Sequence, residues 1–227
     1  MNICLIPARS GSKRIRNKNI KNFFGKPILA YTIQIALKCK LFDRVIVSTD
    51  SKKYSTLAKK YGAEVYFRTK KLSSDMASDL SVIKDFLRYC KKNKSRIYIL
   101  CYLYPINPLL KISTLLKCFK KIKKRNINKL ITLKRYTYPI QRSYIYKRKQ
   151  FLVWDRKSFI KRSQDLKNFY HDAAQCYWYK VKKNFNLYEK SSLKTHGIIL
   201  KTFESHDVDE PEDFETLKKI YKYNLHK

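Results

Sequence analysis

Small and cationic residues follow the first apolar segment of the chain. Residues 3–6 are apolar, and residues 6–19 read IPARSGSKRIRNKN. Gly11 and its flanking serines would let backbone N–H groups approach phosphate oxygens closely, and the cations of this stretch would supply charge. Neither the GxxxxGK[ST] loop nor the GxGxxG pattern occurs. The residues alone therefore leave two interpretations open, a phosphate-binding loop and a solvated basic loop.

Carboxylates form the second chemical signal, because the chain has only 17 of them and several fall in residues 206–215, HDVDEPEDFE. Asp207 and Asp209 are two residues apart, so in an extended backbone both lie on one face and could hold a Mg²⁺ ion that binds phosphate oxygens. Asp209 could equally be the N-cap of a helix that begins at Glu210 or Pro211. One residue can cap while its neighbour binds metal, so both hypotheses stay open.

A third polar cluster lies in residues 162–178, RSQDLKNFYHDAAQCYW. Its mixture of cationic, amide and carboxylate side chains suits a polar, hydroxyl-rich, anionic ligand. Adjacent residues in a strand point to opposite sides, and no Ser or Cys nucleophile motif accompanies His171. We therefore expect His171 to be a structural or ligand-contacting residue rather than a catalytic base.

The elements that must position these residues alternate between strand and helix, which predicts an α/β fold with a mainly parallel sheet. Strands are expected at residues 2–7, 44–50, 64–67, 97–103, 129–134, 175–181 and 197–202. Helices are expected at 27–37, 54–61, 79–92, 112–124 and after Pro211. Ligands of such sheets bind beyond the carboxyl ends of the strands. The loop after the first strand, residues 48–50, residues 104–107 and the start of the fourth helix should therefore converge.

The alternation stops at residues 136–170. Residues 138–146 and 151–154 are expected to be short strands joined by a basic turn. Such an insertion on an α/β core is often an active-site lid or an oligomer contact, and a plain surface excursion is the alternative.

Length and composition limit the number of domains and the class of protein. The chain has 227 residues, which suits one main domain, and no apolar run approaches the ~20 residues needed to cross a bilayer. The N-terminus has no signal-like pattern, so we expect a cytoplasmic protein without membrane insertion. The six cysteines lack metal-ligand spacing and are expected to be small buried hydrophobic residues.

The formal net charge of +35 is typical of a nucleic-acid or polyanion binder. Lys and Arg are spread along the whole chain, however, rather than gathered in one stripe. We therefore expect the charge to govern solubility and nonspecific binding, with no specific nucleic-acid partner.

Three segments resemble the CMP-sialic acid synthetase family, the cytidylyltransferases that activate nonulosonic acids. They are residues 6–33, residues 42–50 and the pair Asp207 and Asp209, and the resemblance covers essentially the whole chain. Within this family, three features most resemble the enzymes specific for pseudaminic acid. One is Tyr104, at a position where the sialic acid enzymes tend to carry Gln. The others are residues 138–142 (YPIQR) and the segment RSQD followed by YHDAAQCYW.

The resemblance assigns roles residue by residue. The expected contacts to the CTP phosphates are Arg9, Ser12, Lys13, Lys18 and Asn19, of which Arg9 and Lys18 would stabilise charge during transfer. Arg68 matches an arginine that contacts the nucleotide in this family. Asp207 and Asp209 match the family's Mg²⁺ ligands, and Asp209 is also expected to be a catalytic residue. The expected contacts to the sugar are Tyr104, Gln175, Gln141, Arg162 and His171.

The resemblance also implies a Rossmann-like, three-layer α/β/α nucleotidyltransferase core with a small β-rich insertion, in a single domain over residues 1–227. The insertion at 136–170 would reach the partner subunit of a homodimer. The implied reaction is attack of the anomeric hydroxyl of a nonulosonic acid on the α-phosphorus of CTP, with release of pyrophosphate. Pseudaminic acid is the expected substrate, with N-acylneuraminate or legionaminate as alternatives. The alternative of another class is a basic RNA- or polyanion-binding protein.

Two positions depart from the family pattern. Arg16 stands where the family often has Pro, so the loop could be less rigid and more charged. Ala174 stands where relatives of the pseudaminate type tend to have Gly, which bears on how closely a sugar approaches that strand. Both leave the presumed catalytic groups in place.

Overall fold

A seven-stranded sheet forms the centre of the computed structural model, which describes residues 1–187 and 195–226. Its order is β11-β7-β10-β6-β1-β4-β5. The strands are β1 (Asn2–Pro7), β4 (Arg44–Thr49), β5 (Glu64–Phe67), β6 (Ile99–Leu103), β7 (Lys129–Arg135), β10 (Tyr170–Lys180) and β11 (His196–Leu200). The pairs β1–β4, β1–β6, β4–β5 and β7–β11 are parallel, whereas β10 runs antiparallel to both β6 and β7. The predicted, mainly parallel sheet is confirmed.

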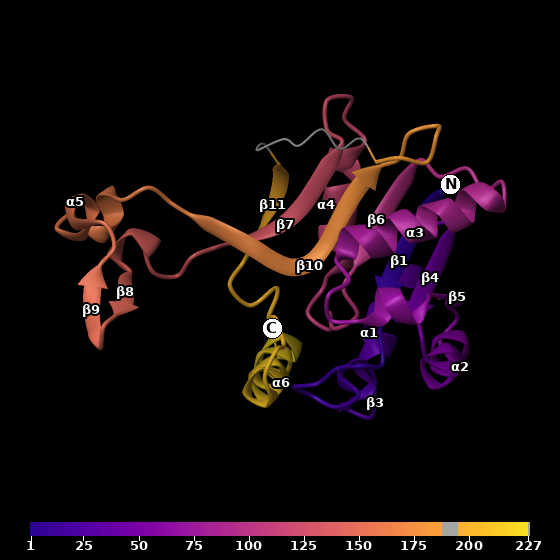
Figure 1. Ribbon diagram of the computed structural model, residues 1–227, viewed down its shortest axis with the longest axis horizontal. Helices are drawn as coiled ribbons and strands as arrows, with labels where there is room; N and C mark the ends of the chain where they lie inside the picture. The colour runs from indigo at the N-terminus through magenta and orange to yellow at the C-terminus, as the bar shows by residue number, and fades with distance from the viewer. Residues whose placement is uncertain (188–194, 227) are drawn as a thin grey trace.

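Helices cover both faces of this sheet (Figure 1). They are α1 (Ile28–Lys38), α2 (Lys52–Lys60), α3 (Asp79–Lys92) and α4 (Ile112–Ile122). Successive side chains of β1 alternate between the faces: Ile3 and Leu5 belong to the apolar cluster of α3, and Cys4 and Ile6 belong to the cluster of α1, α2 and α4. This alternation produces the expected three layers.

Local signals account for the helix boundaries. The side chain of Ser51 accepts a hydrogen bond from the Tyr54 N–H and caps α2, so this helix begins two residues before the predicted start. Gly62, at φ +89, follows the end of α2, in a conformation that glycine adopts without strain. Ser78 caps α3 in the same way, and the predicted range of 79–92 is correct.

A third apolar cluster joins the two ends of the chain. The short strands β2 (Asn22–Phe23) and β3 (Lys26–Pro27) form a hairpin after the 3₁₀ helix η1 (Lys18–Ile20), and α6 (Pro211–Leu225) packs against it. Phe23 makes edge-to-face contacts with Phe214 and Tyr221 of α6. The buried side chains of Ile15 and Val208 belong to the same cluster. The loop after β1 is thereby packed against the segment that precedes α6.

Strand β10 begins at Tyr170, five residues earlier than predicted, and contains an irregularity. Its register with β7 shifts between Asp172 and Tyr177. Ala174, within this bulge, has φ +47, a left-handed conformation that costs an L-residue about 1–2 kcal/mol. The chain therefore carries backbone strain at this position.

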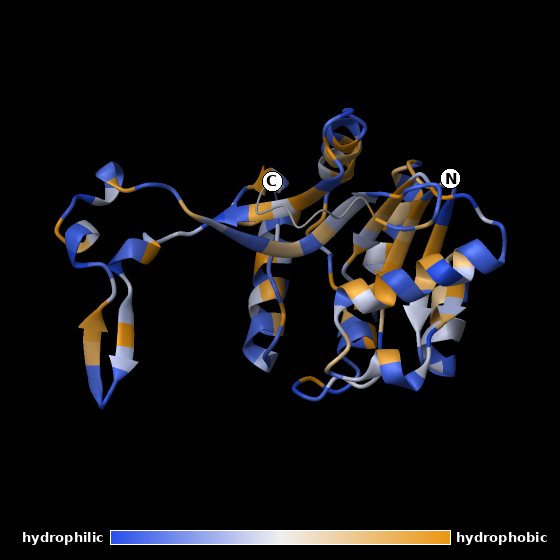
Figure 2. Ribbon diagram, turned by 45° about the horizontal axis from the view of Figure 1, so that its top comes forward, coloured by the Kyte–Doolittle hydropathy of each residue, from blue (hydrophilic) through white to orange (hydrophobic). Residues whose placement is uncertain are grey.

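The insertion projects away from the sheet as an arm, defined here as residues 136–169 (Figure 1). It contains η3 (Ile140–Arg142), β8 (Tyr144–Lys147), β9 (Gln150–Val153), α5 (Arg156–Phe159) and η4 (Ser163–Asp165). The predicted hairpin is present but shorter, because residues 138–142 form a turn and a 3₁₀ helix instead of a strand. Figure 2 shows hydrophobic stretches on this hairpin, far from the sheet.

All six cysteines are buried and unpaired, as expected. None of the helices in the described part of the chain has the length and apolar character needed to cross a membrane.

Candidate active site

A cavity of about 420 Å³ opens where the loop after β1, the ends of β1 and β6, the start of α3 and the segment before α6 meet. Its lining includes nine residues predicted from the sequence: Arg9, Ser12, Lys13, Lys18, Asn19, Arg68, Tyr104, Asp207 and Asp209. They come from four separate parts of the chain, and the carboxyl edge of the sheet brings them together.

Hydrogen bonds from the residue after β4 and from η1 hold the loop after β1. The Asp50 carboxylate, just beyond β4, accepts hydrogen bonds from the Ser10 backbone N–H at 2.9 Å and from its hydroxyl at 3.0 Å. The Asn19 side-chain amide donates to the Arg9 carbonyl at 3.0 Å. Residues 48–50 therefore contribute to the site as expected, by anchoring the loop.

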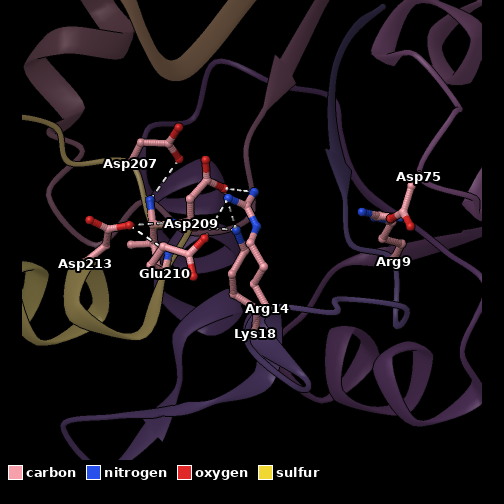
Figure 3. A network of polar contacts seen from close by, with 9 residues as sticks. Arg9, Arg14, Lys18, Asp75, Asp207, Asp209, Glu210 and Asp213 are labelled. Carbon is pink, nitrogen blue, oxygen red and sulfur yellow. Dashed lines mark hydrogen bonds and ion pairs between the residues drawn. The ribbon is translucent and has the colours of Figure 1, made fainter. Parts of the chain in front are cut away.

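On one side of the cavity, two cations share one carboxylate. Asp75 accepts from Arg9 Nη1 at 2.5 Å and from Lys13 Nζ at 2.7 Å (Figure 3 labels Arg9 and Asp75). Hydrogen bonds from Lys13, and then from Arg9, lower the pKa of Asp75. An anionic ligand that binds Arg9 and Lys13 would therefore compete with this carboxylate.

On the other side, cations of the same loop meet the segment before α6 (Figure 3). Arg14 Nη2 lies 2.8 Å from Asp209 Oδ1, and Arg14 Nη1 lies 3.1 Å from Glu210 Oε1. Lys18 Nζ donates to the Val208 carbonyl and lies 3.6 Å from Asp209 Oδ1. The hydrogen bond with Glu210, and then the charge of Asp209, raise the pKa of Arg14.

Asp207, unlike Asp75 and Asp209, forms no ion pair with a lysine or arginine of the described residues. Its Oδ1 accepts the Val208 N–H at 2.9 Å, and no lysine or arginine of residues 1–187 and 195–226 lies within ion-pair distance of it. Burial, and then the charge of Asp209, raise the pKa of Asp207. Two adjacent carboxyl groups, one of them uncompensated, are donors that fit a hard divalent cation such as Mg²⁺. The described residues contain no cluster of three or more potential metal ligands, so substrate oxygens and water would complete the coordination.

The N-cap hypothesis for Asp209 is wrong. Glu210 is the N-cap of α6, and it forms a capping box with Asp213, whose carboxylate accepts the backbone N–H groups of Asp209 and Glu210. Because the Glu210 side chain accepts the Asp213 N–H at the start of the helix, the Asp209 carboxylate is left to face the cavity and Arg14.

Arg68 is a buried cation on the cavity wall. Its side chain is 8% exposed, and its Nε has no hydrogen-bond partner among the described residues. Burial lowers the pKa of its guanidinium group. An unpaired buried donor that borders a cavity is suited to a polar ligand, because the ligand would restore a lost hydrogen bond.

Two tyrosines and an aspartate form a further part of the wall. Tyr104 donates to Asp79 Oδ2 at 2.5 Å, and Tyr102 donates to Asp79 Oδ1 at 2.7 Å. Asp79 is the first residue of α3, and all three residues line the cavity.

Gln175 lies outside the cavity lining. Its side chain is 1% exposed and donates to the Glu204 carbonyl at 2.8 Å, whereas its backbone carbonyl accepts the Tyr104 N–H and the Asn107 amide. Asn107 is likewise buried rather than part of the cavity lining. In this structure Gln175 thus positions Tyr104 through its backbone, and its contact with a sugar stays a prediction.

Three other predicted substrate contacts belong to the arm or its root and do not line the cavity. Gln141 donates to the Lys167 carbonyl at 2.9 Å, Arg162 pairs with Asp165 at 2.9 Å, and the His171 ring packs edge-to-face on Tyr136. Each is engaged within the arm or at its base. Their roles in substrate binding stay predictions.

The sequence did not single out Asp75 or Asp79, and it included Arg14 only among the unnamed cations of residues 6–19. The scarcity of carboxylates and the position of Asp79 at a predicted helix start were available signals. Arg16 is exposed and does not line the cavity. The start of α4 does not line it either, so the prediction that this helix start converges on the site is wrong.

Comparisons with known proteins agree with this geometry. Residues 3–226 match the family model described as "Cytidylyltransferase". The chain belongs to the cytidylyltransferase family. It is 36% identical to the pseudaminic acid cytidylyltransferase of Campylobacter jejuni, over 98% of this chain and 97% of that protein. It is also 49% identical to the N-acylneuraminate cytidylyltransferase of Escherichia coli, over 37% of this chain and 20% of that protein.

A solved structure shows the same fold. CMP:2-keto-3-deoxy-manno-octonic acid synthetase, in complex with CTP, superposes with a TM-score of 0.67 at 15% identity and covers 99% of both chains. The predicted nucleotidyltransferase core is therefore confirmed.

The ion pairs of Asp75 predict that removing its charge increases the affinity of this cytidylyltransferase for CTP. Asp75→Asn should tighten CTP binding about three- to tenfold, because Arg9 and Lys13 would no longer be shared with a carboxylate. Titration calorimetry with CTP measures this. Glu64→Gln is the matched control, since Glu64 pairs with Arg44 away from the cavity and its loss changes the net charge equally. Weaker CTP binding by Asp75→Asn would show that Asp75 instead supports the nucleotide site.

Proposed function

We propose that this cytidylyltransferase transfers CMP from CTP to the anomeric hydroxyl of pseudaminic acid and releases pyrophosphate. The observation that carries the substrate assignment is the 36% identity to the C. jejuni pseudaminic acid cytidylyltransferase over nearly the full length of both chains. The chemistry is supported by the cavity, in which cations and carboxylates approach from opposite sides.

Cations of the loop after β1 would bind the triphosphate. Arg9 and Lys13 would exchange Asp75 for phosphate oxygens, and Ser12 and Asn19 would border them. Lys18 is fixed by the Val208 carbonyl at the opposite side of the cavity, so its charge lies close to the carboxylates. Phosphoryl transfer needs mainly positioning and compensation of negative charge, which these side chains supply without a Ser, Cys or His nucleophile.

Asp207 and Asp209 would hold Mg²⁺. A bound Mg²⁺ supplies Lewis-acid compensation of charge on phosphate oxygens and helps to orient the nucleotide. Arg14 occupies Oδ1 of Asp209, so release of Arg14 would leave both carboxylate oxygens to the ion. Arg14 would then be available to the phosphates from the same side.

The alternative substrates are N-acylneuraminate and legionaminate. The higher identity to an N-acylneuraminate cytidylyltransferase is confined to 85 residues, so it reports on part of the chain only. A cytoplasmic location, and nonspecific binding of RNA or other polyanions by the charge of +35, stay predictions.

Pyrophosphate release tests the proposed function. Purified protein with CTP and Mg²⁺ is incubated separately with pseudaminate, N-acetylneuraminate and legionaminate. We expect turnover with pseudaminate at a kcat/KM at least about tenfold above the other two, since misplaced polar contacts typically cost this much. Preference for another sugar would reassign the substrate, and no turnover with any sugar would contradict the enzyme function.

We further propose that the protein is a homodimer that associates through the arm. The arm carries apolar side chains that its own fold leaves uncovered, among them Phe151, Trp154 and Ile160, which are 72%, 64% and 86% exposed. Clusters of exposed aromatic residues are typical of association surfaces. A projecting arm could also carry Gln141, Arg162 and His171 toward the partner subunit, where their predicted sugar contacts would be made.

Sedimentation velocity tests the dimer. Wild-type protein should sediment as a dimer at micromolar concentration, and Phe151→Glu should shift it toward monomer, because a charge would be buried without a partner. Leu225→Glu, an equally drastic change at an exposed residue of α6, should leave the dimer intact. A monomeric wild type, or a dimeric Phe151→Glu variant, would contradict association through the arm.

A further inference from the structure

Asp79 lies between two phenols on the cavity wall. Its carboxylate oxygens each accept one hydrogen bond, from Tyr102 at 2.7 Å and from Tyr104 at 2.5 Å. Asp79 begins α3, where the positive end of the helix dipole favours a carboxylate, and the Ser78 cap fixes this helix start.

The direction of these hydrogen bonds follows from the donor inventory. A carboxylate can only accept, so both tyrosine protons must point toward Asp79. Burial, and then the interactions with Asp79, raise the pKa of both Tyr104 and Tyr102. The phenols therefore keep their protons at neutral pH, and those protons are committed to Asp79.

The outer side of the Tyr104 oxygen consequently carries lone pairs only. The Tyr177 ring lies beside the Tyr104 ring, with centroids 5.3 Å apart. Tyr104 can meet a ligand in the cavity as a hydrogen-bond acceptor but not as a donor.

We propose that Asp79 is a positioning residue that makes Tyr104 an obligatory hydrogen-bond acceptor, so that the site selects a sugar acid with an amide N–H or a hydroxyl facing Tyr104. The proposal rests on the proposed function, because Tyr104 must face the sugar. A ligand group that can only accept would face the phenol lone pairs and be rejected, which makes the Asp79–Tyr104 pair a determinant of specificity.

Asp79→Asn should reverse the polarity of Tyr104. An asparagine offers one carbonyl oxygen and one amide donor in the same volume. Tyr102 is fully buried, so leaving its hydroxyl without an acceptor is the costlier choice, and the carbonyl should stay with Tyr102. The amide would then donate to Tyr104, whose own O–H would turn into the cavity and oppose a donor on the sugar.

Steady-state kinetics with both substrates tests this. We expect Asp79→Asn to raise the KM for the sugar about tenfold while the KM for CTP changes less than about twofold. Tyr104→Phe should show the same split, and Asp79→Asn added to Tyr104→Phe should raise the sugar KM little further, because its target is gone. Asp79→Ala combined with Tyr102→Phe, which leaves no buried hydroxyl without its acceptor, is the second variant in case the asparagine protein does not fold, and it should raise the sugar KM but not the CTP KM in the same way.

Asp85→Asn is the matched control. Asp85 lies on the same helix and accepts a hydrogen bond from Tyr66 at 2.5 Å, but it does not line the cavity, so both KM values should stay unchanged. Parallel rises of both KM values in Asp79→Asn, or multiplicative effects in the double variant, would overturn the proposal. Either result is interpretable only if the wild-type protein is active. A wild-type protein without turnover on any sugar would instead contradict the proposed function itself.

Discussion

The packing of Ile15 against the cluster that contains Val208 is the constraint on which the active site depends. Ile15 belongs to the loop after β1 and Val208 to the segment before α6, and both are buried together with Phe23 and Phe214. Lys18 adds a hydrogen bond to the Val208 carbonyl. This apolar contact holds cations from one end of the chain opposite carboxylates from the other, and the burial of such side chains contributes about 1.5–3 kcal/mol each.

The charges that this contact brings together are already paired within the protein. Asp75 compensates Arg9 and Lys13, and Asp209 compensates Arg14. These side chains are partly exposed, so each pair is weak enough to be exchanged for phosphate or metal contacts. We propose that the site binds its ligands by replacing these internal partners, and that Asp207, which has no lysine or arginine within ion-pair distance among the described residues, would gain most from a divalent ion. The overall charge of +35 is a poor guide to this balance, since it is spread over the whole surface.

The sequence predicted the parts of the fold that local rules determine. A continuous apolar run identified β1, and the helix predicted at 79–92 matches α3 to the residue. The resemblance to known cytidylyltransferases placed nine residues that line one cavity, seven of them in the loop after β1 and the pair Asp207 and Asp209. Tertiary contacts determined what could not be predicted. The bulge at Ala174 depends on the pairing of β10 with β7, and the burial of Gln175 depends on the Glu204 carbonyl. Asp75 and Asp79 become part of the site only because α3 and its preceding loop fold over the end of β6.

In the proposed mechanism, cations and a metal ion held by carboxylates would bind the triphosphate from opposite sides of the cavity. The measurement that tests this is the Mg²⁺-dependent rate of pyrophosphate release by Asp209→Asn. The control is Glu212→Gln, which removes a carboxylate from the second residue of α6. We expect a loss of at least about 100-fold in kcat for Asp209→Asn, with an unchanged thermal unfolding profile and a control near the wild-type rate. A rate for Asp209→Asn within about twofold of wild type at the same Mg²⁺ concentration would show that Asp209 does not hold the metal ion during transfer.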